Sequence, residues 1–262
     1  MNKLVSIILT TIERPKLLQK CLDSIVNNWP TSVNCMLLIG NQNDYESKSY
    51  KIISKTINDN PTKSIRHYDL EFDCGISKAR NELIHKSLLH NADYIFLTAD
   101  SILCNESMKD LGFIIQEMEK EGYSRCGFNL LGRIGWEATL KLIPGQAFEL
   151  DFIDPKDKEK KLLVPCDIVR NFHLSTTESM VRVGYDPNLI MIEHEDEAYR
   201  YKEVGYKVCC TNFINGLYEK GQNTPEYEKI RATNFRIGQQ RLMDKYSLKK
   251  WVSYRHLERI QL

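Results

Sequence analysis

The residues of this chain best suited to chemistry are the carboxylates clustered at positions 193–196, which open an expected helix. A carboxylate whose pKa is tuned by its site can act as a general base on an attacking hydroxyl group. Acidic residues in the first turn of a helix also interact favourably with the helix dipole, by ~0.3–1 kcal/mol each. Capping and catalysis therefore both remain open for Glu195 and Asp196. A zinc-protease motif is excluded, because the second histidine of His-Glu-x-x-His would fall on Ala198.

The elements that must position this cluster alternate between strands and helices. Residues 4–9, 35–39 and 94–97 are apolar runs typical of strands, whereas residues 15–26 and 77–88 place apolar side chains at helical spacing. This alternation predicts an α/β fold with a doubly wound, mostly parallel sheet and flanking helices. Ligands bind such sheets at the carboxyl ends of the strands. The loops at that edge carry polar residues at positions 10–14, 41–44, 73–80 and 98–101.

Composition narrows the class of protein. The 262 residues include 36 basic and 35 acidic side chains, so the net charge of +1 does not indicate nucleic-acid binding. The eight cysteines show no zinc-binding spacing and most lie in apolar runs, as free cysteines do in a reducing compartment. No segment approaches the ~18 apolar residues of a membrane span, and the amino-terminal apolar run is too short for a signal peptide. We therefore expect a soluble, cytoplasmic protein.

Four segments, taken in order, resemble the motifs of one enzyme family. Residues 5–15 are similar to its first strand and Thr-x-x-Arg turn, and residues 75–81 match its Gly-x-x-x-Ala-Arg-Asn segment. Residues 93–101 stand where the family carries Phe-Leu-Asp-x-Asp, and residues 184–208 are similar to its Gly-Tyr-Asp, Glu-Asp and Gly-Tyr-Lys-Val block. The chain thus resembles the GT-A glycosyltransferases, nearest to the family 2 type. Residues 166–172 resemble more specifically the N-acetylgalactosaminyltransferases related to ganglioside synthases.

The resemblance implies a nucleotide-sugar-dependent transferase, with a UDP-sugar as the favoured donor, that moves a hexosyl or N-acetylhexosaminyl group to an acceptor hydroxyl with inversion. By match to the family's Glu-Asp pair, Asp196 is the expected base and Glu195 would hold acceptor hydroxyls. From the residues themselves, His194 and Trp136 are the other expected acceptor-binding residues. The alternatives are that His194 only orients or lies beside the acids, and that Trp136 is a core or interface aromatic. Trp136 has glycine-rich flanks at positions 132–135, which suit a mobile lid.

The resemblance also implies a set of donor-binding residues at the strand ends. A guanidinium such as that of Arg80 offers a fixed fork of donors to nucleotide oxygens, although a solvent-facing helix residue is the alternative. Asp44 would hydrogen-bond the base, or would only form a turn. The expected donor-binding residues are Thr10, Thr11, Glu13, Arg14, Asp44, Gly75, Arg80 and Asp100.

The sequence departs from the family at the metal site. The first aspartate of Asp-x-Asp is replaced by Thr98, which leaves Asp100 as the expected ligand of Mn²⁺ or Mg²⁺. No histidine occurs in residues 212–218, where the family often completes the metal site. The cofactor is therefore expected to be a divalent cation, with metal dependence left open. The alternative phosphate-binding groups are Lys220, Arg231 and Arg236.

Two further classes compete with an active transferase. The missing aspartate at Thr98 also fits a catalytically inactive sugar-nucleotide-binding or scaffold protein. A nucleotidyltransferase would open with a glycine-rich loop, but residues 10–14 contain no glycine. In either case we expect a GT-A-like domain over residues 1–225 and a helical extension, packed on it, over residues 226–262.

Overall fold

The computed structural model describes residues 3–132, 136–221 and 225–256. Its amino-terminal half follows the predicted alternation of strands and helices. The elements are β1 (Leu4–Thr11), α1 (Pro15–Asn27), β2 (Asn34–Asn41), α2 (Lys48–Asp59), β3 (Ser64–Asp69), α3 (Ile76–Leu89), β4 (Tyr94–Ala99), β5 (Ile102–Cys104), the 3-10 helix η1 (Glu106–Asp110) and α4 (Leu111–Glu121).

The carboxyl-terminal half mixes short strands with helices. The elements are β6 (Arg125–Leu131), β7 (Ala138–Ile143), β8 (Ala147–Phe152), α5 (Pro155–Lys160), β9 (Val164–Cys166), β10 (His173–Thr176), α6 (Thr177–Val183), α7 (His194–Glu203), β11 (Val208–Tyr218), α8 (Pro225–Lys245) and β12 (Val252–Arg255).

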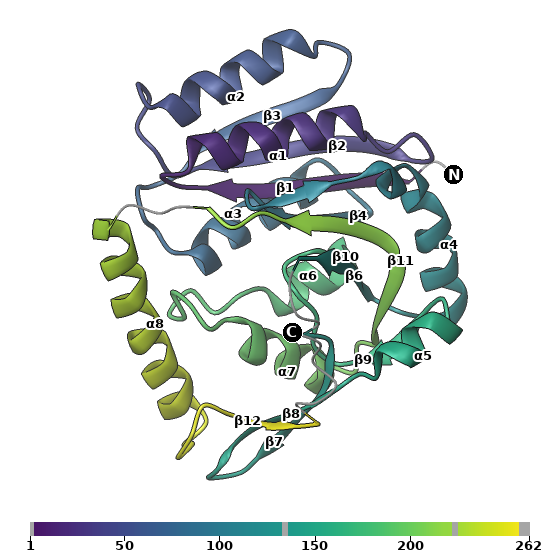
Figure 1. Cartoon of the computed structure of the whole chain (residues 1–262), viewed down its shortest axis with the longest axis vertical. Helices are drawn as coiled ribbons and strands as arrows, with labels where there is room; N and C mark the ends of the chain where they lie inside the picture. Colours follow the sequence, from purple (N-terminus) through teal and green to yellow (C-terminus); the bar gives the residue numbers. More distant parts are fainter. Residues whose placement is uncertain (1–2, 133–135, 222–224, 257–262) are drawn as a thin grey trace.

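The central sheet has the strand order β3-β2-β1-β4-β10-β6-β11-β5, with β9 paired to β11 (Figure 1). Strands β1 to β4 are parallel neighbours, and β11 also runs parallel to β6. Strand β10 is antiparallel to both β4 and β6. The predicted α/β fold with a mostly parallel sheet is therefore confirmed. The reversal at β10 separates the parallel strands β1 to β4 from a mixed part, in which β5 and β9 are antiparallel to β11.

Helices cover the sheet because each buries one apolar face. Pro15 opens α1 at a position where its missing N–H costs nothing, and Leu18, Leu22 and Ile25 are fully buried. This helix shares one core cluster with α2 and α4, whereas α3, α6 and α7 contribute to the cluster on the other face. Successive β1 residues alternate between the two clusters, as the pleat of a strand requires. The carboxyl ends of the central strands are left open for a ligand.

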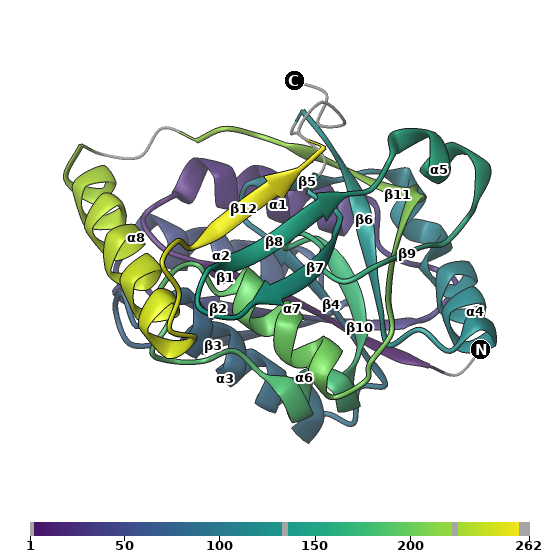
Figure 2. The same cartoon turned by 90° about the horizontal axis from the view of Figure 1, so that it is seen from below.

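A smaller sheet, in the order β12-β8-β7, lies across the molecule from the central sheet (Figure 1) and is nearest the viewer in Figure 2. Helix α8 extends between the two sheets (Figure 1). The helix confirms part of the predicted helical extension, but β12 contradicts the rest. Residues 252–255 pair in parallel with β8, which buries Val252 and gives the edge of β8 a partner. The domain boundary at residue 225 stays a prediction.

The state of the cysteines and the search for membrane-spanning helices bear on two predictions made from composition. All eight cysteines are free. Within residues 3–132, 136–221 and 225–256, no helix has the length and apolar character needed to cross a membrane. A cytoplasmic location stays a prediction.

Candidate functional site

A cavity of about 450 Å³ opens at the carboxyl ends of β1, β2 and β4. Its volume falls within the range of small-molecule sites. One wall is formed by the loops after these strands and by the start of α3, a second by the start of α7, and a third by α8. Polar residues lining it include Thr10, Thr11, Arg14, Gln42, Asp73, Arg80, Ser101, Arg170, Asn171, Glu193, His194, Glu195, Arg231 and Asn234.

The cavity brings together five of the predicted donor-binding residues and leaves three outside. Thr10, Thr11, Arg14, Gly75 and Arg80 line it. Gly75 precedes α3 with φ of 85°, a backbone conformation that side chains other than glycine rarely adopt. The residues outside the lining are Glu13, Asp44 and Asp100.

Glu13 and Asp44 lie on the outer side of the turns that end β1 and β2. Both side chains are exposed, and the Glu13 backbone N–H donates to Asn43 Oδ1 at 2.8 Å. Their neighbour Gln42 lines the cavity in place of Asp44. Sequence reasoning selected the loop at 41–44 but not this residue, because the local pattern does not fix which turn side chain points inward.

Asp100 lies behind the cavity wall. Its side chain is 0% exposed, its Oδ2 accepts a hydrogen bond from Thr11 Oγ1 at 3.0 Å, and its Oδ1 lies 2.7 Å from Arg14 Nη2. Burial raises the pKa of Asp100, while the charge of Arg14 and the Thr11 hydroxyl act in the opposite direction. Oδ2 therefore has a hydrogen-bond donor, whereas Oδ1 has the ion-pair contact with Arg14 but no hydrogen bond among the described residues. Arg14, and not Asp100, faces the cavity.

This arrangement does not fit the predicted metal site. A hard divalent cation needs several oxygen ligands, whereas Asp100 is enclosed and Thr98 is buried outside the cavity lining. Across the described parts of the chain, no group of three or more His, Cys, Asp or Glu side chains could hold a metal ion. The position of Asp100 thus speaks against its expected role as a ligand of Mn²⁺ or Mg²⁺.

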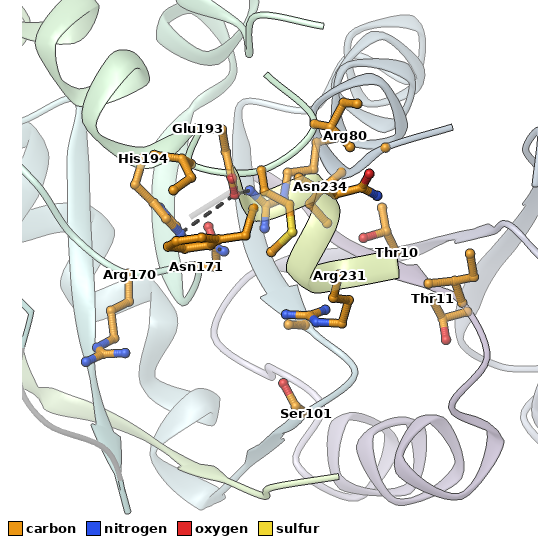
Figure 3. A pocket seen from close by; sticks show the side chains of 18 of the residues that line it. Thr10, Thr11, Arg80, Ser101, Arg170, Asn171, Glu193, His194, Arg231 and Asn234 are labelled. Carbon is orange, nitrogen blue, oxygen red and sulfur yellow. Dashed lines mark hydrogen bonds and ion pairs between the residues drawn. The ribbon is translucent and has the colours of Figure 1, made fainter. Parts of the chain in front are cut away.

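Arg80 forms a buried ion pair beneath the acidic cluster. Its Nη1 lies 2.7 Å from Glu193 Oε1 (Figure 3). Its guanidinium lies over the Tyr185 ring, 5.0 Å from the ring centroid. Burial acts to raise the pKa of Glu193, but the charges of His194 and Arg80 lower it overall. His194 also lies 3.1 Å from Asn171 Nδ2 through its Nε2. Arg80 therefore lines the cavity as a neutralised pair with Glu193.

The neighbouring residues Glu195 and Asp196 face different surroundings. Glu195 lines the cavity and is 2% exposed, and burial raises its pKa to about 7. Asp196 is 0% exposed and lies outside the lining. Its carboxylate accepts hydrogen bonds from Arg200 Nε at 2.9 Å and Tyr246 Oη at 2.8 Å, and Lys245 Nζ lies 2.6 Å away. Asp196 therefore joins α7 to the end of α8.

Two tryptophans line the cavity, Trp136, which was predicted as an acceptor-binding residue, and Trp251. The indole N–H group of Trp136 is buried and has no hydrogen-bond partner among the described residues. The Trp251 indole lies close enough to Glu195 to act against the rise of its pKa. Arg170 stacks over Trp136 at 5.5 Å. Residues 133–135 of the predicted lid lie outside the described residues.

Helix α8 supplies two polar side chains to the cavity. One was predicted only as an alternative phosphate-binding residue, and the other was not predicted. Of the three alternative phosphate-binding residues, Arg231 lines the cavity, whereas Lys220 and Arg236 are exposed and do not. Figure 3 shows Arg231 between Thr11 and Arg170, with Ser101 nearby. Asn234 also lines the cavity from α8.

Solved structures define the class of fold. A scan against protein-family models finds no match, and a search of curated proteins finds none. Structures with the GT-A fold are nevertheless similar over most of the chain. The chain has the fold of the GT-A glycosyltransferases, with its cavity at the strand ends that the doubly wound topology selects.

Particular structures give the extent of the likeness. TarS 1–349 of S. aureus matches with a TM-score of 0.60 at 12% identity, covering 95% of this chain and 73% of that chain. The same fragment in complex with UDP-GlcNAc gives a TM-score of 0.60 at 11% identity, covering 93% and 73%. GalNAc-T7 with UDP, GalNAc and Mn²⁺ gives a TM-score of 0.67 at 11% identity, covering 84% of this chain and 44% of that chain.

Proposed function

We propose that this protein transfers a sugar from a UDP-sugar to an acceptor hydroxyl group. The observation that carries the proposal is the cavity itself, which joins the strand-end residues of a GT-A fold to a buried carboxylate of raised pKa, Glu195. Two of the similar structures hold UDP-GlcNAc or UDP with GalNAc and Mn²⁺. These ligands support a UDP-sugar donor, with hexoses and N-acetylhexosamines as the sugars to test.

The donor is assigned to the part of the cavity formed by β1, β2 and α3. Gln42 and Asp73 provide polar groups at the end of the cavity beside β2. Thr10, Thr11 and Arg14 follow β1, where the diphosphate would lie next to a guanidinium. The acceptor is assigned to the opposite part, where Asn171 and His194 present polar atoms and the tryptophans present apolar surface suited to a sugar ring.

We assign the role of base to Glu195 in place of Asp196. In an inverting transfer the acceptor oxygen bonds to the anomeric carbon, the bond to UDP breaks with its electron pair on the diphosphate, and a base takes the hydroxyl proton. A base whose pKa is near the working pH is best suited to this step. Glu195 has this property and faces the cavity, whereas Asp196 is enclosed by Arg200, Tyr246 and Lys245.

The catalytically inactive alternative is not favoured by this site. A protein that only bound the nucleotide would have no need of a buried carboxylate without a cationic partner in the cavity. Burying a carboxyl group without a cationic partner costs free energy, and such groups concentrate at active sites. Glu195 has no ion pair among the described residues, unlike its neighbours Glu193 and Asp196.

The test is hydrolysis of UDP-sugars by the full chain, followed through UDP release in the absence of added acceptor. We expect release from at least one of UDP-GlcNAc, UDP-GalNAc, UDP-glucose and UDP-galactose. Glu195→Gln should lower this turnover by about 10²-fold or more, as is common for loss of a general base, while UDP binding is kept. Full turnover in Glu195→Gln would refute the assigned base, and absence of both turnover and nucleotide binding would refute the proposed function.

A further inference from the structure

We infer that the diphosphate of the donor is bound by Arg14 and Arg231, without a bridging divalent cation. This inference rests on the proposed function and concerns the same cavity. GT-A proteins include one whose structure holds Mn²⁺ with UDP, so the inference sets this chain apart from that protein. It follows from where the carboxylates and the guanidinium groups lie.

The carboxylates are placed unfavourably for a cation at the diphosphate. Asp100, the remaining member of the Asp-x-Asp pair, is withdrawn behind Arg14 and Thr11 and does not line the cavity. Glu193 is held by Arg80. A cation that used Asp100 would have to break a contact of 2.7 Å with Arg14 and leave that guanidinium beside a second positive charge. Asp100 is therefore a positioning residue for Arg14.

Arg14 is positioned to replace the cation. Its side chain is 20% exposed and lines the cavity, with one nitrogen on Asp100. A guanidinium carries five N–H donors, so this contact leaves others available. The Nε atom of Arg14 is buried and has no hydrogen-bond partner among the described residues. A buried donor without an acceptor costs free energy that an incoming phosphate oxygen would recover.

Arg231 adds a second positive charge from α8. It lines the cavity and is close enough for its charge to act on Asp100, where it opposes the rise of the carboxyl pKa caused by burial. Arg14 from the loop after β1 and Arg231 from α8 therefore both line the cavity and both act on Asp100. When the anomeric bond breaks, negative charge grows on the diphosphate, and fixed positive groups stabilise it as a metal ion would.

The experiment measures the affinity of the full chain for UDP and for uridine by calorimetry, after chelator treatment and again with added Mn²⁺. We expect the affinity for UDP to change by less than about twofold between the two conditions. Arg231→Gln should weaken UDP binding about tenfold, which is the loss of roughly one charge-assisted hydrogen bond, and should leave uridine binding unchanged. The matched control is Arg236→Gln on the same helix, where the side chain is exposed and outside the cavity.

The outcomes separate this inference from the proposed function. UDP binding that requires Mn²⁺, or an Arg231→Gln variant with the affinity of the parent, would overturn the inference and leave the transferase proposal standing. Absence of UDP binding under both conditions would overturn both. Arg14→Gln is a second variant, and its thermal stability should be measured alongside because it leaves Asp100 buried without its cationic partner.

Discussion

Three successive acids at the start of α7 show how the surroundings of a side chain decide its role. Glu195 faces the cavity, Asp196 meets Lys245 and Tyr246 from the end of α8, and Glu197 lies 2.6 Å from Arg125 Nη1 on β6. Neighbouring residues on a helix point in different directions, so each acid meets a different part of the fold. The sequence motif identified the right turn of helix but not which carboxylate lines the cavity.

At the residue scale, Asp196→Asn is expected to affect stability more than chemistry. The substitution leaves Lys245 and Arg200 without a buried anion, which should lower the free energy of unfolding by about 1–3 kcal/mol. Thermal denaturation measures this loss. UDP-sugar turnover below the unfolding transition should fall much less than in Glu195→Gln. Loss of turnover as severe as in Glu195→Gln, in a variant as stable as the parent, would restore Asp196 as the base.

The raised pKa of Glu195 predicts the dependence on pH. A base must be deprotonated, so kcat/KM should rise with pH through about 7 and flatten above it. The native state also holds this proton at pH values where the unfolded chain, with a pKa near 4.5, releases it. The contribution of Glu195 to the free energy of unfolding is therefore fully present below pH 4.5, and it is lost as the pH rises from 4.5 through about 7.

The Glu195→Gln variant is the control for the pH dependence of kcat/KM and for the pH dependence of the unfolding free energy. Its unfolding free energy should lack this decline between pH 4.5 and about 7. A rate profile that is flat from pH 5 to 8 in the parent protein would show that Glu195 does not titrate in the reaction.

At the element scale, α8 docks against the segment that leads into α7. A Cβ atom at Gly238 would lie 2.4 Å from the backbone oxygen of Met191. The next residue, Ile192, has φ of 65°, which is strained for a β-branched side chain and places it beside Glu193. The close contact of α8 with residues 191–192 thus positions the residues that line the cavity before α7.

Gly238→Ala is therefore expected to displace α8 although alanine favours helix. Overpacking of this kind costs about 1–3 kcal/mol, which exceeds the gain of roughly 1 kcal/mol in helix propensity. Thermal denaturation should show lower stability, and UDP binding should weaken because Arg231 moves with α8. Thr233→Ala, at an exposed position of the same helix, is the control. Higher stability in Gly238→Ala than in Thr233→Ala would contradict the tight contact.

How far the sequence predicts the elements depends on how local their causes are. β1 and α1 were predictable because their causes are local. Residues 4–9 form a nearly continuous apolar run, and residues 15–26 place apolar side chains at helical spacing. β12 was not, because it forms by pairing with β8 about a hundred residues earlier in the chain. The position of Asp100 behind Arg14 and the contact of Asp196 with Lys245 have the same origin, since both join segments distant in sequence.

At the scale of the whole molecule, the cavity is assembled from both ends of the chain. The loop after β1 supplies Arg14, and α8 supplies Arg231. Trp251 directly precedes β12 of the small sheet and lines the cavity, so the segment that contradicted the helical prediction contributes to the site. The doubly wound core alone therefore does not make the site, and the extension beyond β11 belongs to it.

The bond from Asp196 to the end of α8 has a consequence for how the substrates act on each other. Asp196 stands next to Glu195 on α7, and its partners Lys245 and Tyr246 stand at the far end of the helix that carries Arg231. A nucleotide that binds Arg231 and restricts the motion of α8 would therefore also restrict the motion of α7, the helix that carries Glu195. We therefore expect the binding of donor and acceptor to be thermodynamically linked through Asp196, each favouring the binding of the other.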